Sequence, residues 1–504
     1  MTTNAKFKGH GAAVLCLDLS SPSQSSSPLL LSGSEDGTAR LWDLRDHRRR
    51  ACMCIKVPGG GDVLSAVFAP RSDEAKTIPN ETTAFGRDCS VYLGVENTVL
   101  EYDLRHTESP LILSEPTKDW SRLLQNQDEV NQISLAYYNK DNDKSNNTSS
   151  GGGKKKKNQK KKGGSGGNKK RQQQSSGGER GVESLYLAAC DDAGKIRWTE
   201  SLVSRTSNHD NAGAVDASAN SRYENHGTST ILHHDNHGVA VVPACSFRPV
   251  NNTGGGGGSV LELASGGTDC KIQLWDVFRP KKPLSTFVIN QNNNEEEKSK
   301  PQVCNPPFVY SLNWSNNGKS LAAGLGDGTV GVFEINNRTL VQSQLLVGNE
   351  GNDGTMHYAH ESSVASVVYP SFSAPTSDRI LCSAGSDGSI VFWDLGTPND
   401  VHWEDDFEDI KNKNCDSKVD STDVVDNLLP TTLLQALRND GAGAYDTNTT
   451  TASHNPRILF DISHGQKINW ITRALQSNNT LREYNGTIFV GDTSSEITSY
   501  TIPF

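Results

Sequence analysis

Three sets of histidine, serine and aspartate residues have the side-chain types of a nucleophilic catalytic triad. In such a triad the histidine accepts the serine proton, which makes the serine oxygen a nucleophile. Each set is followed by a tryptophan six residues after the aspartate. The sets are His10, Ser32, Asp36 and Trp42; His237, Ser265, Asp269 and Trp275; and His360, Ser383, Asp387 and Trp393. Because an enzyme needs one active site rather than three copies, the repetition favours a structural role.

A second cluster, formed by His233, His234 and His237, has side chains that could bind a metal ion. Its spacing fits neither a helix-borne HExxH motif nor a zinc finger, and His237 already belongs to one of the three sets. The ten cysteines contain no CxxC pair. We therefore expect an exposed polar loop here and no metal site.

Two glycine-rich stretches, 59–61 and 254–258, are the candidates for a phosphate-binding loop. Neither is followed by Lys-Ser/Thr and a helix, which such a loop needs. No unique acidic or histidine cluster suggests a hydrolase. The sequence therefore predicts no cofactor and no enzymatic activity.

The net charge of −10 hides an uneven distribution. Residues 150–182 carry eleven Lys/Arg and one Glu, whereas residues 399–426 carry ten Asp/Glu and three Lys. No aromatic residues interrupt the lysine clusters at 154–157, 160–162 and 169–171, so stacking on bases is not indicated and no specific nucleic acid is expected. A nuclear localisation signal, a non-specific polyanion patch and a solvated insertion all remain open for these clusters.

Membrane insertion and secretion are not expected. No apolar run approaches the roughly 20 residues that cross a bilayer, and the first residues lack a charged leader followed by an apolar stretch. Cysteines such as Cys16 and Cys190 lie in apolar, strand-like runs, which is typical of reduced, buried thiols. We expect a nuclear or cytoplasmic protein.

One sequence motif, the recurring phrase, is repeated along the chain. It consists of an apolar run, small residues, a turn of the Asp-Gly kind, and a run of alternating apolar and polar residues that ends on an aromatic residue. Two degenerate copies, at 91–105 and 487–502, place Glu96 and Ser494 in the aspartate slot. Apolar alternating runs precede the copies, which predicts seven units of four strands. In five copies an aspartate precedes the aromatic by six positions: Asp36/Trp42, Asp192/Trp198, Asp269/Trp275, Asp327/Phe333 and Asp387/Trp393.

The Gly-His near the start and the Trp-Asp near the end of these units resemble the WD40 repeat. The resemblance implies an all-β, seven-bladed propeller with four-stranded blades. A strand-like stretch, Asn4–Lys8, precedes the first unit, and the last unit ends on a third strand, so the N-terminal strand should complete the last blade and close the ring. The repeats are expected at about 7–45, 62–105, 128–200, 237–278, 307–335, 360–396 and 464–504.

The same resemblance implies a role for the histidine sets. In WD40 proteins these positions correspond to a structural tetrad, a buried chain of hydrogen bonds Trp–Ser–His–Asp that must be fully satisfied to be tolerated. Repeats two, five and seven lack parts of it, so we expect those blades to be less rigid.

The remaining residues form long low-complexity insertions. A basic one spans 139–182, a loop-like one spans 201–227, and an acidic one spans 399–456, within which 427–438 could form a short amphipathic helix. Shorter stretches at 251–258, 290–306 and 342–357 are expected to be loops or linkers.

Residues 30–45 resemble the sixteen-residue box of substrate receptors of cullin–RING ubiquitin ligases. In that family the WDxR ending contacts the adaptor, the large subunit of the damage-specific DNA-binding protein. Here the ending includes Trp42, Asp43 and Arg45, and a weaker copy in repeat two includes Asp103 and Arg105. The aspartate should fix the turn and leave the arginine fork projecting.

Taken together, these patterns predict a monomeric, non-enzymatic propeller that binds proteins. The resemblance implies a substrate receptor that binds the ligase adaptor and substrates the sequence does not identify. The alternative is a scaffold of a nuclear or cytoplasmic complex without a ligase link.

Overall fold

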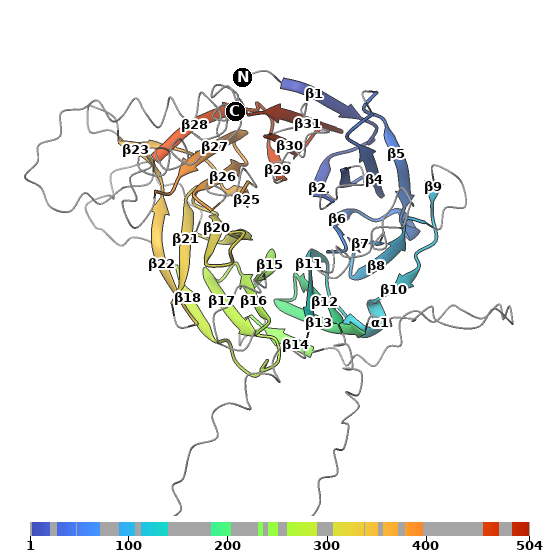
Figure 1. Ribbon diagram of the computed structural model, residues 1–504, viewed down its shortest axis with the longest axis horizontal. Coiled ribbons are helices and arrows are strands. Elements are labelled where there is room, and N and C mark those ends of the chain that lie inside the picture. Colours follow the sequence, from blue (N-terminus) through green and yellow to red (C-terminus); the bar gives the residue numbers. More distant parts are fainter. Residues whose placement is uncertain are drawn as a thin grey trace, which may run out of the picture.

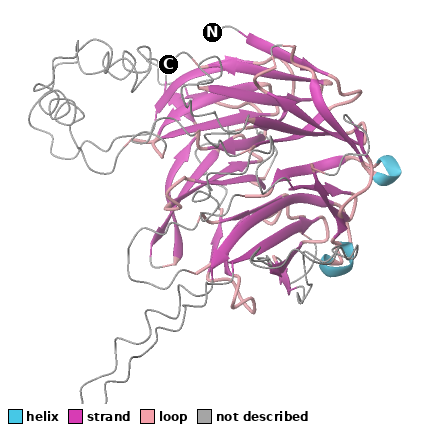
Figure 2. Ribbon diagram, turned by 45° about the vertical axis from the view of Figure 1, so that its right-hand side comes forward, coloured by secondary structure: helices cyan, strands magenta, loops and turns pink. Residues whose placement is uncertain are grey.

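A computed structural model describes the protein as a ring of seven blades around a central axis (Figure 1). Strands dominate, and the helical elements among the residues that the structure describes are α1 (Ser121–Leu124) and the 3-10 turn η1 (Pro58–Gly60) (Figure 2). The described residues are 3–20, 28–46, 48–70, 90–105, 112–139, 183–202, 230–234, 240–249, 260–289, 306–336, 338–350, 356–370, 378–396, 457–472 and 486–502. Among them, no helix has the length and apolar character to cross a membrane.

The first four blades follow one another along the chain, each with its first strand nearest the axis (Figure 1). They contain β2 (Val14–Leu19), β3 (Leu29–Ser34), β4 (Thr38–Asp43) and β5 (Ala51–Lys56); β6 (Val63–Phe68), β7 (Ser90–Val95), β8 (Thr98–Asp103) and β10 (Lys118–Asp119); β11 (Val130–Asn139), β12 (Glu183–Asp191), β13 (Lys195–Leu202) and β14 (Thr230–His233); and β15 (Ala244–Phe247), β16 (Glu262–Gly266), β17 (Lys271–Asp276) and β18 (Ser285–Val288).

Blades 5 to 7 repeat the pattern and complete the ring. They contain β19 (Val309–Trp314), β20 (Ser320–Leu325), β21 (Val330–Asn336) and β22 (Thr339–Leu346); β25 (Val364–Val368), β26 (Ile380–Gly385), β27 (Ser389–Asp394) and β28 (Arg457–Ser463); and β29 (Ile468–Ile471), β30 (Thr487–Asp492), β31 (Glu496–Thr501) and β1 (Thr3–Lys8).

The N-terminal strand closes the ring, as the sequence predicts. β1 pairs antiparallel with β31, and Phe7 lies opposite Ile497. The Phe7 ring is fully buried and packs edge-on against Trp42 of blade 1 and Phe489 of blade 7. The first strand of the chain therefore joins the last blade to the first.

Small residues at the ends of the second strands let neighbouring blades approach. A Cβ on Gly33 would lie 2.7 Å from Val63 Cγ1, and one on Gly266 would lie 2.2 Å from Val309 Cγ1, in the first strand of the next blade. Contacts this short would force the blades apart. The small residues in the recurring phrase therefore mark the lines where blades meet.

Three departures from regular blades occur. A fifth strand, β9 (Ile112–Leu113), pairs in parallel with β5. The fourth strand of blade 2 is only two residues long. The stretch 342–357, expected to be a linker, instead contains the end of β22 and a hairpin of β23 (Gly348–Glu350) and β24 (Met356–Tyr358). The possible helix at 427–438 lies outside the described residues.

The ring has two distinct faces. The turns between second and third strands lie on one face, which we call the histidine face because the histidines described below meet these turns. The third strands end on the opposite face, the arginine face, where Arg45 follows β4 and Arg105 follows β8. β11, β13 and β27 also end there, and they lead into 140–182, 203–229 and 397–456.

Candidate functional site

The first histidine set is joined by hydrogen bonds inside blade 1. His10 Nε2 lies 2.7 Å from Ser32 Oγ, and the Trp42 indole N–H donates to the same oxygen at 2.9 Å. His10 Nδ1 lies 3.1 Å from an Asp36 carboxylate oxygen. Ser32 and Trp42 are fully buried. A serine oxygen in this setting is closed to substrate, so it links strands rather than attacking a bond.

Blade 6 builds the same chain, with a closer link through the residue two positions after the aspartate. His360 Nε2 lies 2.7 Å from Ser383 Oγ, which accepts the Trp393 indole N–H at 2.8 Å. On the other side, His360 Nδ1 lies 2.6 Å from Ser389 Oγ, which in turn bonds Asp387 at 2.6 Å. The histidine thus reaches the aspartate mainly through Ser389.

In blade 4 the histidine of the set is His234, and the prediction of His237 was wrong. His234 Nδ1 lies 2.8 Å from Ser265 Oγ, and Nε2 lies 3.1 Å from Asp269. Trp275 donates to Ser265 at 2.9 Å. His237 lies outside the described residues.

The misassignment has a simple cause. His10 and His360 each precede the first strand of their blade by four residues, and His237 has this spacing to Val241. Blade 4 instead starts its first strand at Ala244, so its histidine comes from directly after β14. His234 is also fully buried, which overturns the expected exposed polar loop. The described residues contain no group of three side chains able to hold a metal ion.

Blade 7 carries a variant of the chain that the sequence analysis missed. His464 Nε2 lies 2.6 Å from Asp492, and Nδ1 lies 2.6 Å from the Tyr500 hydroxyl. The tyrosine reaches the histidine without an intervening serine. The aspartate role belongs to Asp492 rather than to the Ser494 slot, because Ser494 instead donates its backbone N–H to Asp492.

These histidine-linked aspartates share a lowered pKa. Burial alone would raise each pKa, but hydrogen bonds from the histidine and neighbouring groups outweigh it. The four residues are Asp36, Asp269, Asp387 and Asp492. A carboxyl whose pKa is lower in the folded state stabilises the fold above its usual pKa of 3.8, and this contribution is lost as the pH falls through the folded value.

Replacing Asp387 by Asn is therefore expected to destabilise the protein at neutral pH and much less in acid. The difference from wild type in the free energy of unfolding should begin to shrink below about pH 4, where the unfolded carboxyl takes up a proton. Its charge-dependent part is lost only as the pH falls through the lower pKa of the folded state. Urea unfolding at several pH values measures it. A difference that stays constant with pH would contradict the assigned role.

Blade 3 departs from the pattern because its turn is longer. The Lys195 N–H donates to Asp191 Oδ1 across four residues, whereas the Thr38 N–H donates to Asp36 across two. This shift turns Trp198 towards blade 4, so its assignment to the aromatic slot was wrong, and Thr199 takes the position that faces blade 2. In blades 1, 4 and 6, which have the complete set, the tryptophan faces the preceding blade. These residues are Trp42, Trp275 and Trp393.

Trp120 fills the space that Thr199 leaves between blades 2 and 3. It is buried among Tyr92 of blade 2 and Leu185 and Leu187 of blade 3. Its indole N–H donates to the buried carboxylate of Glu101 at 3.1 Å. Trp120 lies outside the recurring phrase, so no repeat pattern could have identified it.

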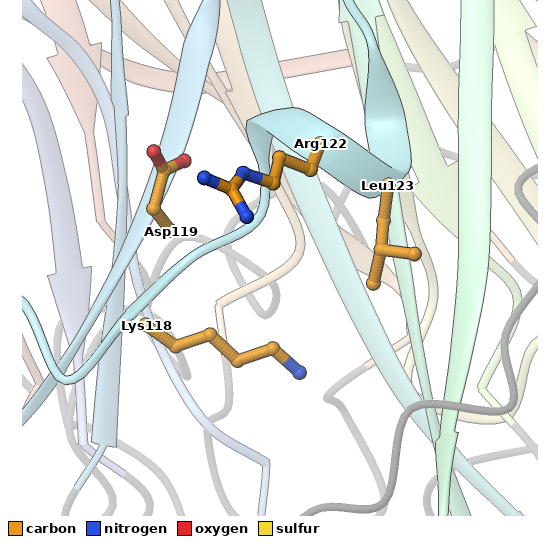
Figure 3. A pocket seen from close by; sticks show the side chains of 4 residues that line it. All are labelled: Lys118, Asp119, Arg122 and Leu123. Atoms are coloured by element: carbon orange, nitrogen blue, oxygen red, sulfur yellow. The ribbon is translucent and has the colours of Figure 1, made fainter.

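A cavity of about 500 Å³ opens beside this tryptophan. Lys118, Asp119, Arg122 and Leu123 line it, from β10 and α1 (Figure 3). The Lys118 ammonium lies 3.3 Å from the centre of the Trp120 ring, and burial lowers the pKa of Lys118 to about 8. The cavity therefore has a lysine whose charge depends on pH near neutrality.

The two WDxR turns place an ion pair at the same position of neighbouring blades. The Arg45 backbone N–H donates to Asp43 at 2.9 Å, and its guanidinium folds back onto the same carboxylate at 3.3 and 3.4 Å. Arg105 holds Asp103 in the same way, at 2.5 to 3.2 Å. The guanidinium of each arginine, which was expected to project freely, therefore donates part of its N–H groups to the aspartate of its own turn.

The aspartate cap recurs elsewhere, but the arginine does not. Asp276 accepts the Phe278 N–H at 3.0 Å, and Asp394 accepts the Gly396 N–H at 3.0 Å. The aspartate is therefore a general device for the turn. Arg45 and Arg105 distinguish blades 1 and 2 from these others.

Comparison with known proteins agrees with this geometry. The family model described as WD domain, G-beta repeat, matches residues 1–43, 302–334 and 351–394. The chain carries WD40 repeats. The WD40 propeller supports a role in protein interaction, and propellers of this kind are typically non-enzymatic scaffolds.

Several WD40 proteins are similar to this chain. WD repeat-containing protein 53 homolog of Dictyostelium discoideum is 23% identical over 98% of this chain and 92% of its own length. The sequence resembles WD repeat-containing protein 53 in four stretches: 128–135, 184–196, 305–314 and 464–504. WD repeat-containing protein VIP3 of Arabidopsis thaliana is 32% identical over 25% of this chain and 33% of its own.

The segments that the family model matches lie in blades 1, 5 and 6, together with β1, which belongs to blade 7. They do not include blades 2, 3 and 4 or the other strands of blade 7. Blade 2 has Tyr102 in the tryptophan slot, blade 3 has Thr199, and blade 7 has Tyr500. Blade 4 keeps its complete tetrad, but its histidine comes ten residues before its first strand, and a run of five glycines at 254–258 lies between its first two strands. Changed slots and interruptions together account for the missing matches.

Proposed function

We propose that this protein is a substrate receptor that docks on the adaptor of a cullin–RING ubiquitin ligase through the turns Asp43–Arg45 and Asp103–Arg105. The observation that supports it best is the matched pair itself. Two adjacent blades present the same aspartate-held arginine on the same face, within sequence that resembles the receptor box.

The chemistry of these turns suits a protein partner. A guanidinium has five N–H donors. Asp43 accepts hydrogen bonds from Nε and Nη2 of Arg45, which leaves the Nη1 donors to bind carbonyl or carboxylate oxygens of a partner. The Arg45 side chain is 57% exposed and that of Arg105 37%. Because each aspartate fixes its arginine in advance, less side-chain entropy is lost on binding.

In this role the chain performs no chemistry of its own. The receptor would hold a substrate near the ubiquitin carrier, which raises the local concentration of target lysines. The histidine face and the rim of the propeller would remain available for the substrate.

The double variant Arg45→Ala/Arg105→Ala is expected to lose the adaptor and cullin in affinity capture read by mass spectrometry. Its melting temperature should stay within a few degrees of wild type. The Arg45–Asp43 pair is exposed and contributes about 0–1 kcal/mol, and the more buried Asp103 keeps the hydrogen bond from the backbone N–H of residue 105. Arg279→Ala, in the matching turn of blade 4, is the control and should retain both partners. If the adaptor is absent from wild-type captures or survives the double variant, the ligase role fails and the scaffold alternative replaces it.

A further inference from the structure

The turn after β17 presents an exposed aromatic side chain next to three cations. Phe278 is 39% exposed, the Arg279 side chain is 80% exposed, and Lys281 and Lys282 are exposed. We call residues 278–282 the blade-4 turn. It lies on the arginine face, and an exposed apolar ring followed by three cations in the same turn is suited to an acidic segment that contains aromatic residues.

Neighbouring side chains fix the geometry of this turn. The Phe278 ring rests on Tyr138 and Tyr186 of blade 3, at centroid distances of 5.2 and 5.9 Å, which holds the ring in place. Asp276 lies 3.9 Å from Arg279 Nε, at the limit of an ion pair. Among the described residues, Lys281 and Lys282 have no carboxylate within ion-pair distance.

A segment of complementary composition belongs to the same chain. Residues 400–410, DVHWEDDFEDI, contain six Asp/Glu and no Lys/Arg, together with Trp403 and Phe407. The segment lies between Gly396 and Arg457, which both sit at the arginine face of blade 6. An extended chain covers up to about 3.5 Å per residue, so residues 403–409 can lie up to ~25–45 Å from Gly396. Blade 4, two blades away in the same ring, is therefore within reach.

Other surfaces suit this segment less well. On the histidine face, burial and the nearby carboxylates of Asp192, Asp62, Asp128 and Glu96 raise the pKa of Glu129, which indicates a strongly negative region. The lysine-rich stretch 154–171 has the right charge, but it contains no apolar residue. The blade-4 turn combines positive charge with an aromatic ring.

We propose that residues 400–410 dock on the blade-4 turn of the same molecule. An aromatic side chain of the segment packs on Phe278, and its carboxylates pair with Arg279, Lys281 and Lys282. The tether gives an effective concentration in the millimolar range, so a contact that is weak between separate molecules is well populated here. The docked segment covers part of the face that carries Arg45 and Arg105.

Zero-length coupling with a carbodiimide in the purified full chain tests this docking. The reagent activates a carboxylate, a lysine amine attacks it, an amide forms and the urea leaves. Lys281 and Lys282 should couple to residues 404–409 at least about fivefold more than Lys319, as the effective concentration of a docked partner exceeds that of a tethered one. Lys319 is a stringent control, because it is exposed on the arginine face of blade 5, one blade nearer to Gly396. Preferential coupling to Lys319 or to lysines 154–170 would overturn the proposal.

A second measurement separates charge pairing from proximity. A chain with 400–410 replaced by Gly/Ser of equal length is titrated with a fluorescein-labelled peptide of residues 400–410. Arg279→Glu/Lys281→Glu/Lys282→Glu should weaken binding at least about tenfold, and 0.5 M salt should weaken it too, because screening reduces exposed ion pairs. Lys319→Glu should leave binding unchanged. Equal binding to the triple variant would refute the docking, and since no ligase component is present, the result is independent of the proposed receptor function.

Discussion

Replacing Trp120 by Ala is expected to lower the free energy of unfolding by about 3–5 kcal/mol, the range for removing a large buried aromatic side chain. Trp120 fills the seam between blades 2 and 3 where Thr199 takes the usual tryptophan position. Its loss also leaves the buried Glu101 carboxylate without the indole N–H that it accepts at 3.1 Å. Urea unfolding followed by far-UV circular dichroism measures the change.

Lys118→Ala is the matched control for this prediction. It removes the ammonium above the Trp120 ring but leaves the indole in the seam. Because Lys118 is half-buried, the expected loss is about 0.5–2 kcal/mol, the range for a cation–π contact between exposed and desolvated sites. A loss for Trp120→Ala no larger than that of Lys118→Ala would show that the seam does not depend on the tryptophan.

Removing residues 1–8 is expected to destabilise the whole propeller by at least about 3–5 kcal/mol, because this deletes the fully buried Phe7 ring together with its strand. The deletion also leaves β31 as an unpaired edge, which favours association between molecules. Differential scanning fluorimetry and light scattering should report a lower melting temperature and aggregation.

Lys6→Ala/Lys8→Ala keeps the strand and removes only its ion pairs with Glu496. These lysines are more than half exposed, so the pair of changes should cost no more than about 1 kcal/mol. If the deletion behaves like this double variant, β1 is not needed to close the ring.

The fold could be predicted from sequence because every blade solves the same packing problem. An apolar first strand, small residues in the second strand and a tight turn before the third are local features, and they recur even where Tyr102 or Phe333 replaces tryptophan. Closure by β1 followed from counting: the last unit lacked a fourth strand, and a strand-like stretch preceded the first.

The site residues were harder because they depend on which side chain turns inward. His237 had the spacing of His10 and His360, but the strand of blade 4 begins later, which brings His234 into the hydrogen-bond chain. Trp198 had the right distance from Asp192, but a longer turn moves it to the other side of the sheet. In blade 7 the Tyr500 hydroxyl bonds His464 directly and replaces the serine and tryptophan of the other blades. A pattern based on residue identity does not detect this replacement.

Ring closure also has a consequence for biosynthesis. Lys6 and its partner Glu496 are 490 positions apart, and at about 5–20 residues per second their synthesis is separated by about 25–100 s. During that interval Trp42, Leu30 and Leu44 of blade 1 have no blade 7 to cover them, and β1 has no strand to pair with. The first blade to leave the ribosome is thus the last to be completed, and its exposed apolar face is the natural target for a chaperone acting on the nascent chain.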